Sequence, residues 1–503
     1  MPFHRRSLAT LLPALCLAVF VLFVNAHWFR MPMVEASDYA ANSLQVYGAK
    51  HFRELLGNYS RWGFHHPGPV FFYLFAVGET VFMDLLHLAP APMNAHEITL
   101  ILINTALLFG AIEICASHFC NPLFRPLGWL AAVFVIANLN HGGEEQALVS
   151  LWMPNVAFFP FLFLVVACAS TLAGRISHLP FVTLGAGMML HLHAAQVAFV
   201  AALCLPVGAV VACQIVRTGS FRAHASTLAV SGALAALFVL PIALEALIHK
   251  PNNLYYIRAY LRKYPNPHQG WDVAAKYLLC FLTLAPDAER LTPGPAIRIV
   301  QCALQTPHVV VFWIVLSASA GTAAWLRVRG GRLRFAALLV ALCGLVTCVF
   351  LYWADRITGE MFTFNGYFFF SIHLVVLFAM AGILSERLSG SRFMSVQLTR
   401  GIWLAPMVLT LCCAAAFHNP FTGYPEIGPL SDSLPAAAHY QLVFGRDDWE
   451  TAAGVANQIT RRGQTFCVTD DWAFIFGQEH ICSGTGSVRP IVITRGGWHD
   501  LGQ

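Results

Sequence analysis

Two carboxylates, Glu35 and Asp38, are the first residues of the chain that could do chemistry, and they directly follow a long apolar segment. Residues three apart share a face of a helix, so both would point the same way if this turn is helical. A partly desolvated carboxylate is a suitable general base for a hydroxyl group. The alternative is a hydrated loop carboxylate near a lysine or arginine, and position alone leaves both interpretations open.

A second acidic pair, Glu144 and Glu145, lies in a short polar segment between two apolar ones. Together with Asp38, these side chains could supply some of the several oxygen ligands that a hard divalent cation needs. Carboxylates alone are weak evidence for such a site. The sequence therefore allows a divalent metal without indicating one, and a solvated loop is the alternative.

The chain has 21 histidines, but their spacing does not indicate a metal site. His191 and His193 are two apart, so on a helix they would point to different faces. His65 and His66 are adjacent, which is also a poor arrangement for holding one ion. We expect these histidines to hydrogen-bond in a polar substrate cavity near the ends of the apolar segments.

Cationic side chains occur in two further polar segments. Arg356 lies in a short one, where its guanidinium could hold a phosphate through two hydrogen bonds or pair with Glu360, four residues on. A longer segment, 248–307, mixes cations with tyrosines, which could bind a lipid phosphate or suit lipid head groups in general. Its cations are Lys250, Arg258, Arg262 and Lys263, and its tyrosines include Tyr255, Tyr256 and Tyr264.

The composition places these residues in a membrane protein. Of 503 residues, 57% are hydrophobic and only 11% are charged, with a mean hydropathy of +0.63. Soluble proteins carry about a quarter charged residues. The net charge of +5 is modest, and no basic stretch interleaved with aromatic residues suggests nucleic-acid binding, so that class is set aside.

Hydropathy predicts an all-α polytopic protein with about eleven spanning helices. The first apolar run could be mistaken for a cleaved signal peptide, but its length favours a retained span. The predicted spans are 8–26, 96–117, 126–139, 153–173, 179–195, 197–216, 226–248, 308–326, 335–353, 363–384 and 401–418.

One further apolar stretch, 70–88, is predicted to lie along the membrane surface. Tyr73, Thr80, Asp84 and His87 recur at helical spacing and form a polar stripe, which is typical of an interfacial helix. If this stretch does not cross, the arginine-rich connectors all fall on the cytoplasmic side, as the positive-inside rule expects. The alternative is an ordinary span with a few polar residues.

This topology assigns sides and domains. We expect a protein of the bacterial inner (plasma) membrane with a cytoplasmic N-terminus and with its long polar loops and C-terminal tail on the periplasmic side. Residues 1–418 would form the transmembrane domain, with juxtamembrane helices in the first outer loop, 27–95, and 419–503 a small α/β periplasmic appendage. In that appendage 447–461 is predicted as helix and 465–469 as strand. Spacing leaves open whether Cys467–Cys482 or Cys280–Cys302 form disulfides.

An acidic residue after the first span, a long outer loop and the entry His66-Pro67-Gly68-Pro69 into an interfacial helix resemble the GT-C superfamily. These are membrane glycosyltransferases that use polyprenyl-phosphate-linked sugars, such as protein O-mannosyltransferases and aminoarabinose transferases. The resemblance covers roughly residues 1–384 in architecture, with its sharper motifs within 30–75. The family's entry reads His-Pro-Pro or Tyr-Pro-Pro, so Gly68 is a departure that leaves the subfamily open.

The resemblance implies roles for the residues above. Asp38 would be the catalytic base, with Glu35 as the less expected substitute. Glu144 or Glu145 would position the acceptor or a metal. Arg356, in a late outer loop, would hold the lipid phosphate of the donor.

The expected function is therefore inverting transfer of a sugar from a polyprenyl-phosphate donor to a lipid, glycan or protein hydroxyl. No nucleotide-binding glycine loop is present in the sequence. A transporter or flippase is the alternative from another class, but such proteins place ionisable residues midway through their spans and show repeated halves. A polymerase or ligase of cell-surface polysaccharide is a third candidate.

Overall fold

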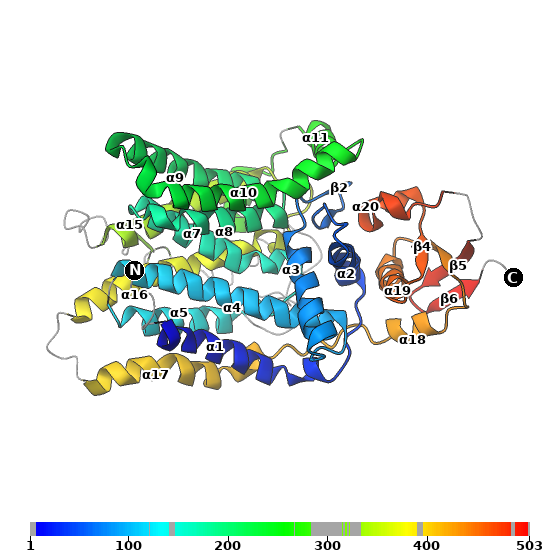
Figure 1. Cartoon of the computed structure of the whole chain (residues 1–503), viewed down its shortest axis with the longest axis horizontal. Coiled ribbons are helices and arrows are strands. Elements are labelled where there is room, and N and C mark those ends of the chain that lie inside the picture. Colours follow the sequence, from blue (N-terminus) through cyan, green and yellow to red (C-terminus); the bar gives the residue numbers. More distant parts are fainter. Residues whose placement is uncertain are drawn as a thin grey trace.

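The computed structural model describes residues 7–119, 121–139, 146–265, 267–282, 333–389, 396–483 and 488–500, together with residues 314, 317, 318 and 321. Long helices lie side by side in a bundle, and a small α/β unit stands at one end of it (Figure 1). This arrangement confirms the predicted class of a polytopic helical membrane protein with a small α/β appendage.

The bundle matches the hydropathy prediction closely. Among the described residues, six helical segments are long and apolar enough to span a membrane, and three apolar helices are shorter. Each predicted span except 308–326 coincides with a helix; 308–326 lies almost entirely outside the described residues. The bundle helices are α1 (Ser7–Val24), α4 (Pro92–Phe119), α5 (Phe124–Leu139), α6 (Met153–Val156), α7 (Phe158–Leu172), α8 (Leu179–Leu192), α9 (Gln196–Thr218), α10 (Phe221–Ile248), α12 (Trp271–Cys280), α15 (Arg334–Asp355), α16 (Ser371–Ser389) and α17 (Val396–Cys412).

Helix α7 forms the centre of the bundle, and α10 lies at its edge. The span containing α7 is 94% buried inside the protein, whereas only 11% of the corresponding window of α10 is buried. A helix that is apolar all round is expected either in a protein core or against lipid. Helix α7 is an example of the first, and α10 has the exposed apolar surface expected of the second. At Gly185 of α8, an added Cβ would lie 3.0 Å from the side chain of Leu164, so this glycine lets α8 approach α7 closely.

The first outer loop folds into short elements at one end of the bundle. They are α2 (Ser37–Lys50), a hairpin of β1 (Tyr59–Ser60) and β2 (Phe64–His65), and α3 (Val70–Gly78), which continues as the π-helical segment η2 (Glu79–Leu85). Helix α3 runs across the ends of the long helices, between the bundle and the α/β unit (Figure 1). The stretch 70–88 thus lies across the ends of the long helices and not alongside them (Figure 1), and its position relative to the membrane stays a prediction.

The glycine in the entry to α3 has a packing explanation. A Cβ at Gly68 would lie 2.4 Å from the imidazole of His191, so no larger residue fits there. His191 in turn accepts a hydrogen bond from the backbone N–H of Val70 (3.3 Å), and its other ring nitrogen contacts the carbonyl of Phe238 (2.9 Å). The ring thus ties the start of α3 to α8 and α10, and this explains the departure from a Pro-Pro entry.

The C-terminal unit, residues 427–500, has a four-stranded sheet in the order β4-β3-β5-β6. Strand β3 is parallel to both of its neighbours, and β6 pairs antiparallel with β5. The predicted helix and strand at 447–461 and 465–469 correspond to α19 and β4. The helices and strands of the C-terminal unit are α18 (Ile427–Asp432), β3 (His439–Val443), α19 (Trp449–Arg461), β4 (Thr465–Cys467), α20 (Ala473–Phe476), β5 (Arg489–Thr494) and β6 (Gly497–Asp500).

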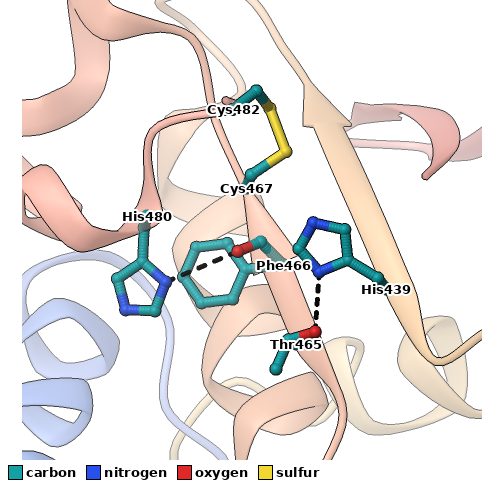
Figure 2. Close-up of a disulfide and its surroundings, with 6 residues drawn as sticks. All are labelled: His439, Thr465, Phe466, Cys467, His480 and Cys482. Atoms are coloured by element: carbon teal, nitrogen blue, oxygen red, sulfur yellow. Dashed lines mark hydrogen bonds between the residues drawn. A yellow bond between two sulfur atoms is a disulfide. The ribbon is translucent and has the colours of Figure 1, made fainter. Parts of the chain in front are cut away.

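A disulfide joins Cys467 to Cys482 in this unit (Figure 2). It links the end of β4 to the segment after α20, next to the stacked rings of Phe466 and His480, whose centroids are 4.2 Å apart. The disulfide confirms the Cys467–Cys482 pairing, one of the two that the cysteine spacing left open. Cys302 lies outside the described residues, so the pairing with Cys280 stays a prediction.

Candidate active site

Asp38 lies in the first turn of α2, at the end of the bundle nearest the C-terminal unit. Ser37 adopts a left-handed φ of 54°, which turns the extended chain sharply into the helix. The first turn of a helix is a common position for acidic side chains, because the helix N-terminus carries a partial positive charge. A non-glycine residue at positive φ is strained, and such strain is typical of functional sites.

Both oxygens of Asp38 accept hydrogen bonds from aromatic side chains. The hydroxyl of Tyr59 donates to one, and the indole Nε1 of Trp152 donates to the other at 3.0 Å. Burial and the adjacent carboxylate raise the pKa of Tyr59, so it stays a neutral donor. Each carboxylate oxygen has a second lone pair, which leaves Asp38, itself half-buried, able to accept a proton from a further group.

Trp152 connects Asp38 to a late segment of the chain. Its ring centroid is 4.7 Å from that of Phe364, in the 3₁₀ segment η6 (Thr363–Phe370). On the other side of Asp38, Tyr59 belongs to the hairpin that also carries Trp62, and Trp62 lies 3.6 Å from the position of a Cβ on Gly359. The segment 359–364 therefore contacts both Trp152 and the hairpin, and each of these provides a hydrogen-bond donor to Asp38.

The loop that carries Arg356 is held in place by the segment before α12. Buried Asp355 accepts hydrogen bonds from the backbone N–H of Gly270 (3.0 Å) and from Nδ1 of His268 (2.9 Å). The amide of Gln269 donates to the carbonyls of Ile357 (2.8 Å) and Gly359 (2.9 Å). These contacts join residues 268–270 to Asp355, Ile357 and Gly359, so the turn that carries Arg356 is held on both sides.

Arg356 is partly exposed and lies at the same end of the bundle as Asp38. Its guanidinium carbon is 5.3 Å from the ring centroid of Tyr352, and its Nε is 3.5 Å from Asp355. The side chain of Arg356 is 30% exposed, so part of it can be reached from outside the protein. A guanidinium held in this way presents a forked set of donors, which suits a phosphate.

Glu35 lies away from Asp38, in the contact between α2 and the C-terminal unit. Its carboxyl group is buried and accepts hydrogen bonds from Ser43 (3.0 Å) and from Asn457 of α19 (3.1 Å). Burial raises the pKa of Glu35, and the nearby positive charge of Arg461 opposes that shift. These contacts give Glu35 a part in joining two elements, which favours Asp38 over Glu35 as the base.

The same contact contains an ionic cluster that sequence reasoning missed. Glu79 is fully buried and receives two hydrogen bonds of 2.7 Å from Arg461 of α19, one of 2.9 Å from His96, and one of 3.4 Å from Lys50. Burial alone would raise the pKa of Glu79, but these hydrogen bonds and charges lower it well below its usual value. We call Glu79, Arg461 and their partners Ser43, His96 and Lys50 the α2–α19 joint.

The adjacent histidines of the first loop hold the loop to the bundle. The ring of His66 is 4.1 Å from that of His193, and its Nδ1 accepts the backbone N–H of Ala194 at 3.2 Å. His65 contacts the carbonyl of Gly57 through Nδ1 at 3.1 Å. No group of three or more metal-binding side chains occurs in the part of the chain that the structure describes.

His66 makes the stability of the protein depend on pH. Burial, together with the neighbouring His193 and His65, lowers the pKa of His66 well below its ordinary value of 6.5. The unfolded chain therefore binds this proton more readily, so the stability is present above about pH 6.5 and is lost as the pH falls below it. We expect the Tm of the purified protein to be flat from about pH 7 to 8 and to fall on acidification.

The control for this pH dependence is His66→Asn, whose side-chain oxygen can still accept the amide of Ala194. Its Tm should fall less steeply with acidification than that of the wild-type protein. Parallel Tm curves for the two proteins would show that another group is responsible.

The remaining predicted residues are not brought to Asp38 by any described contact. Glu144 and Glu145 lie outside the described residues. Lys250 donates to the carbonyl of Ala246 (2.7 Å) at the end of α10, and Arg262 is exposed on α11 (Asn253–Lys263). Conversely, the roles of Tyr59 and Trp152 beside Asp38 were not predicted, since no spacing rule connects them to it.

Comparison with known proteins identifies the fold. No protein-family model matches the sequence, and no curated protein matches it. Among solved structures, ArnT from Cupriavidus metallidurans bound to undecaprenyl phosphate is similar, with a TM-score of 0.51 and 11% identity over 96% of this chain and 93% of that one. At this identity the likeness shows a shared fold, and it confirms the GT-C architecture that the sequence predicted.

Two structures of an oligosaccharyltransferase from Archaeoglobus fulgidus are weaker matches. One, AglB in complex with an inhibitory peptide and a dolichol-phosphate, has a TM-score of 0.42 and 12% identity over 90% of this chain and 64% of that one. The other, a complex with Zn and sulfate, has a TM-score of 0.44 and 13% identity over 91% and 62%. The chain thus spans less than two thirds of these longer proteins.

Proposed function

We propose that this chain, which has the GT-C fold, is a membrane glycosyltransferase that moves a sugar from a polyprenyl-phosphate donor to a hydroxyl acceptor, with inversion. The observation that carries the proposal is the placement of Asp38. A carboxylate stands at the start of a juxtamembrane helix, holds hydrogen bonds from Tyr59 and Trp152, and lies where the first outer loop meets the segment 359–364.

In the proposed reaction, Asp38 takes the proton of the acceptor hydroxyl, and the hydroxyl oxygen attacks the anomeric carbon of the sugar. The bond between that carbon and the phosphate oxygen breaks, and the polyprenyl phosphate leaves with the electron pair. Arg356 holds the phosphate as its negative charge grows. The attack comes from the face opposite the leaving group, so the configuration at the anomeric carbon inverts.

Several other residues have supporting roles in the proposed reaction. Lys250 and Arg262 are further candidates for the lipid phosphate, and His65 and His66 for the walls of the substrate cavity. Glu144 and Glu145 are candidates for positioning the acceptor, and a divalent metal is left unassigned. The neighbour ArnT was solved with undecaprenyl phosphate bound, which supports a lipid-linked donor of this chemical class.

The proposed reaction takes place on the periplasmic side of a bacterial inner membrane, with the N-terminus in the cytoplasm. Connector arginines lie at the ends of the long helices opposite the C-terminal unit, which supports this orientation through the positive-inside rule. The Cys467–Cys482 disulfide supports an oxidising compartment for residues 419–503, the proposed appendage to a 1–418 membrane domain. The described connector arginines are Arg125, Arg175, Arg217, Arg222, Arg334 and Arg387.

The proposal is tested with the purified chain in a bilayer containing a radiolabelled polyprenyl-phosphate sugar. Release of free polyprenyl phosphate together with labelled acceptor would support a transferase. Movement of intact lipid-linked sugar across the bilayer without cleavage would support a flippase instead. Growth of a repeating glycan on the lipid carrier would indicate a polysaccharide polymerase.

We expect Arg356→Gln to lower the rate of polyprenyl-phosphate release by about 100-fold, because it removes a preorganised charge from the leaving group. Arg356→Lys should be intermediate, since lysine keeps the charge but not the forked donor geometry. Arg446→Gln, at an exposed position of the C-terminal unit, is the matched control and should keep the wild-type rate. A wild-type rate for Arg356→Gln would remove Arg356 from this role.

A further inference from the structure

Helix α11 is fixed to the first outer loop by one of its faces. The side-chain oxygen of Asn253 accepts the backbone N–H of His65, and its amide donates to the carbonyl of His65, both at 2.8 Å. Further along, the ring of Tyr260 lies 5.2 Å from Phe64 and 5.5 Å from Trp62. Figure 1 shows α11 at the end of α10, beside β2.

The opposite face of α11 mixes apolar and cationic side chains in the open. Leu254 is 51% exposed and Leu261 is 61% exposed, and Arg258 and Arg262 are exposed between and beside them. These positions follow one another at spacings of four, three and one, so they share one face of the helix. Tyr255, 59% exposed, borders this face. We call Leu254, Arg258, Leu261 and Arg262 the outer face of α11.

The cations of this face have no acidic partner among the residues that the structure describes. The sequence contains no aspartate or glutamate between Glu245 and Asp272. In the parts of the chain that are described, neither Arg258 nor Arg262 forms an ion pair. Two guanidinium groups thus stay available for an anionic partner outside the protein.

The position of α11 brings this face to the edge of the lipid. Exposed apolar side chains continue along α10 to its last turn, where Leu247 is 75% exposed and Ile248 is 63% exposed. Only four residues, 249–252, lie between Ile248 and Asn253 at the start of α11. Large leucines this exposed are unfavourable in water, but they are well placed at the boundary between head groups and acyl chains.

We infer that the outer face of α11 lies on the membrane surface and binds anionic phospholipid head groups of the bilayer. Leu254 and Leu261 would enter the acyl boundary, while Arg258 and Arg262 hold head-group phosphates through paired hydrogen bonds. The face points away from the hairpin on which α11 packs, and Asp38 is bonded to Tyr59 of that hairpin. This separates the outer face from Asp38, so a bulk phospholipid is the occupant that fits, and Arg262 is assigned to it in place of the donor phosphate.

Such contact would also steady the first outer loop. Because Asn253, Tyr260 and the hairpin form one packed group, an anchored α11 holds the hairpin at a set height above the membrane. The inference does not depend on the proposed transferase activity, since it rests on exposure, charge and position alone.

The test uses the full-length protein in a neutral detergent, titrated with phosphatidylglycerol or with phosphatidylcholine while its Tm is followed. Phosphatidylglycerol should raise the Tm of the wild-type protein, and phosphatidylcholine should not. In the variant Arg258→Gln/Arg262→Gln, the phosphatidylglycerol concentration that gives half of the Tm rise should increase about 30-fold at low salt. Raising the salt concentration should weaken the wild-type response in the same direction.

The matched control is Arg446→Gln/Arg495→Gln, which removes two arginines from the surface of the C-terminal unit, away from α10 and α11. It should respond to phosphatidylglycerol as the wild-type protein does. Equal responses of the two double variants would overturn the inference. A variant defect seen with undecaprenyl phosphate but not with phosphatidylglycerol would also overturn it, because the arginines would then serve the donor.

Discussion

Replacing Asp38 with asparagine is expected to lower the rate of sugar transfer by about 10²- to 10⁴-fold, the usual contribution of a positioned general base. The substitution keeps the shape of the side chain. The asparagine oxygen can still accept the indole N–H of Trp152, and its amide can donate to the hydroxyl oxygen of Tyr59, which can reverse its role. The fold should therefore survive, and only the capacity to take a proton is lost.

The measurement is transfer from a labelled polyprenyl-phosphate sugar, with the Tm of each variant checked in parallel. Glu35→Gln is the informative comparison, because Glu35 lies just before α2, three residues from Asp38, but its carboxyl group contacts α19. It should lose stability more than transfer rate. Full activity of Asp38→Asn together with inactive Glu35→Gln, at unchanged Tm, would exchange the two roles and reject the proposed site.

Features set by local pattern were predictable from the sequence. Apolar runs long enough to cross lipid predicted the helices of the bundle, and the polar stripe of 70–88 indicated that α3 would not run alongside them. Asp38 and Arg356 were singled out in the same way, because each stands in a polar segment at the end of a span, and their roles stay predictions. These inferences depend only on residues near one another in sequence.

Contacts between segments far apart in the chain could not be predicted from the sequence. Nothing in the pattern connects Trp152 to Asp38, and the residues of the α2–α19 joint are further apart still, with Glu79 and Arg461 separated by 382 positions. The requirement for glycine at position 68 is a similar case, because it comes from the imidazole of His191 on α8. Helix periodicity tells which face a residue occupies, but the partner on that face is decided by how the helices pack.

Loss of Arg461 from the α2–α19 joint should have a large effect on stability. Arg461→Met should weaken the attachment of the C-terminal unit by about 3–5 kcal/mol, the usual effect of removing one partner from a buried ion pair. Glu79 is fully buried and would lose its two shortest hydrogen bonds. Since Lys50 and His96 remain beside it, the lower end of this range is expected. The checks are a lower Tm and faster tryptic release of residues 419–503.

The adjacent arginine provides the control. Arg462 pairs with Asp432, which is 72% exposed and belongs to the C-terminal unit itself, so Arg462→Met should cost less than about 1 kcal/mol. The two variants remove the same charge at neighbouring positions, and the main difference is that the acidic partner is buried for Arg461 and exposed for Arg462. Similar proteolysis rates for both would mean that apolar packing of α19 on α2 holds the unit. In the double variant Glu79→Gln/Arg461→Met, the loss should be smaller than the sum of the single losses, because no buried charge is then left without its partner.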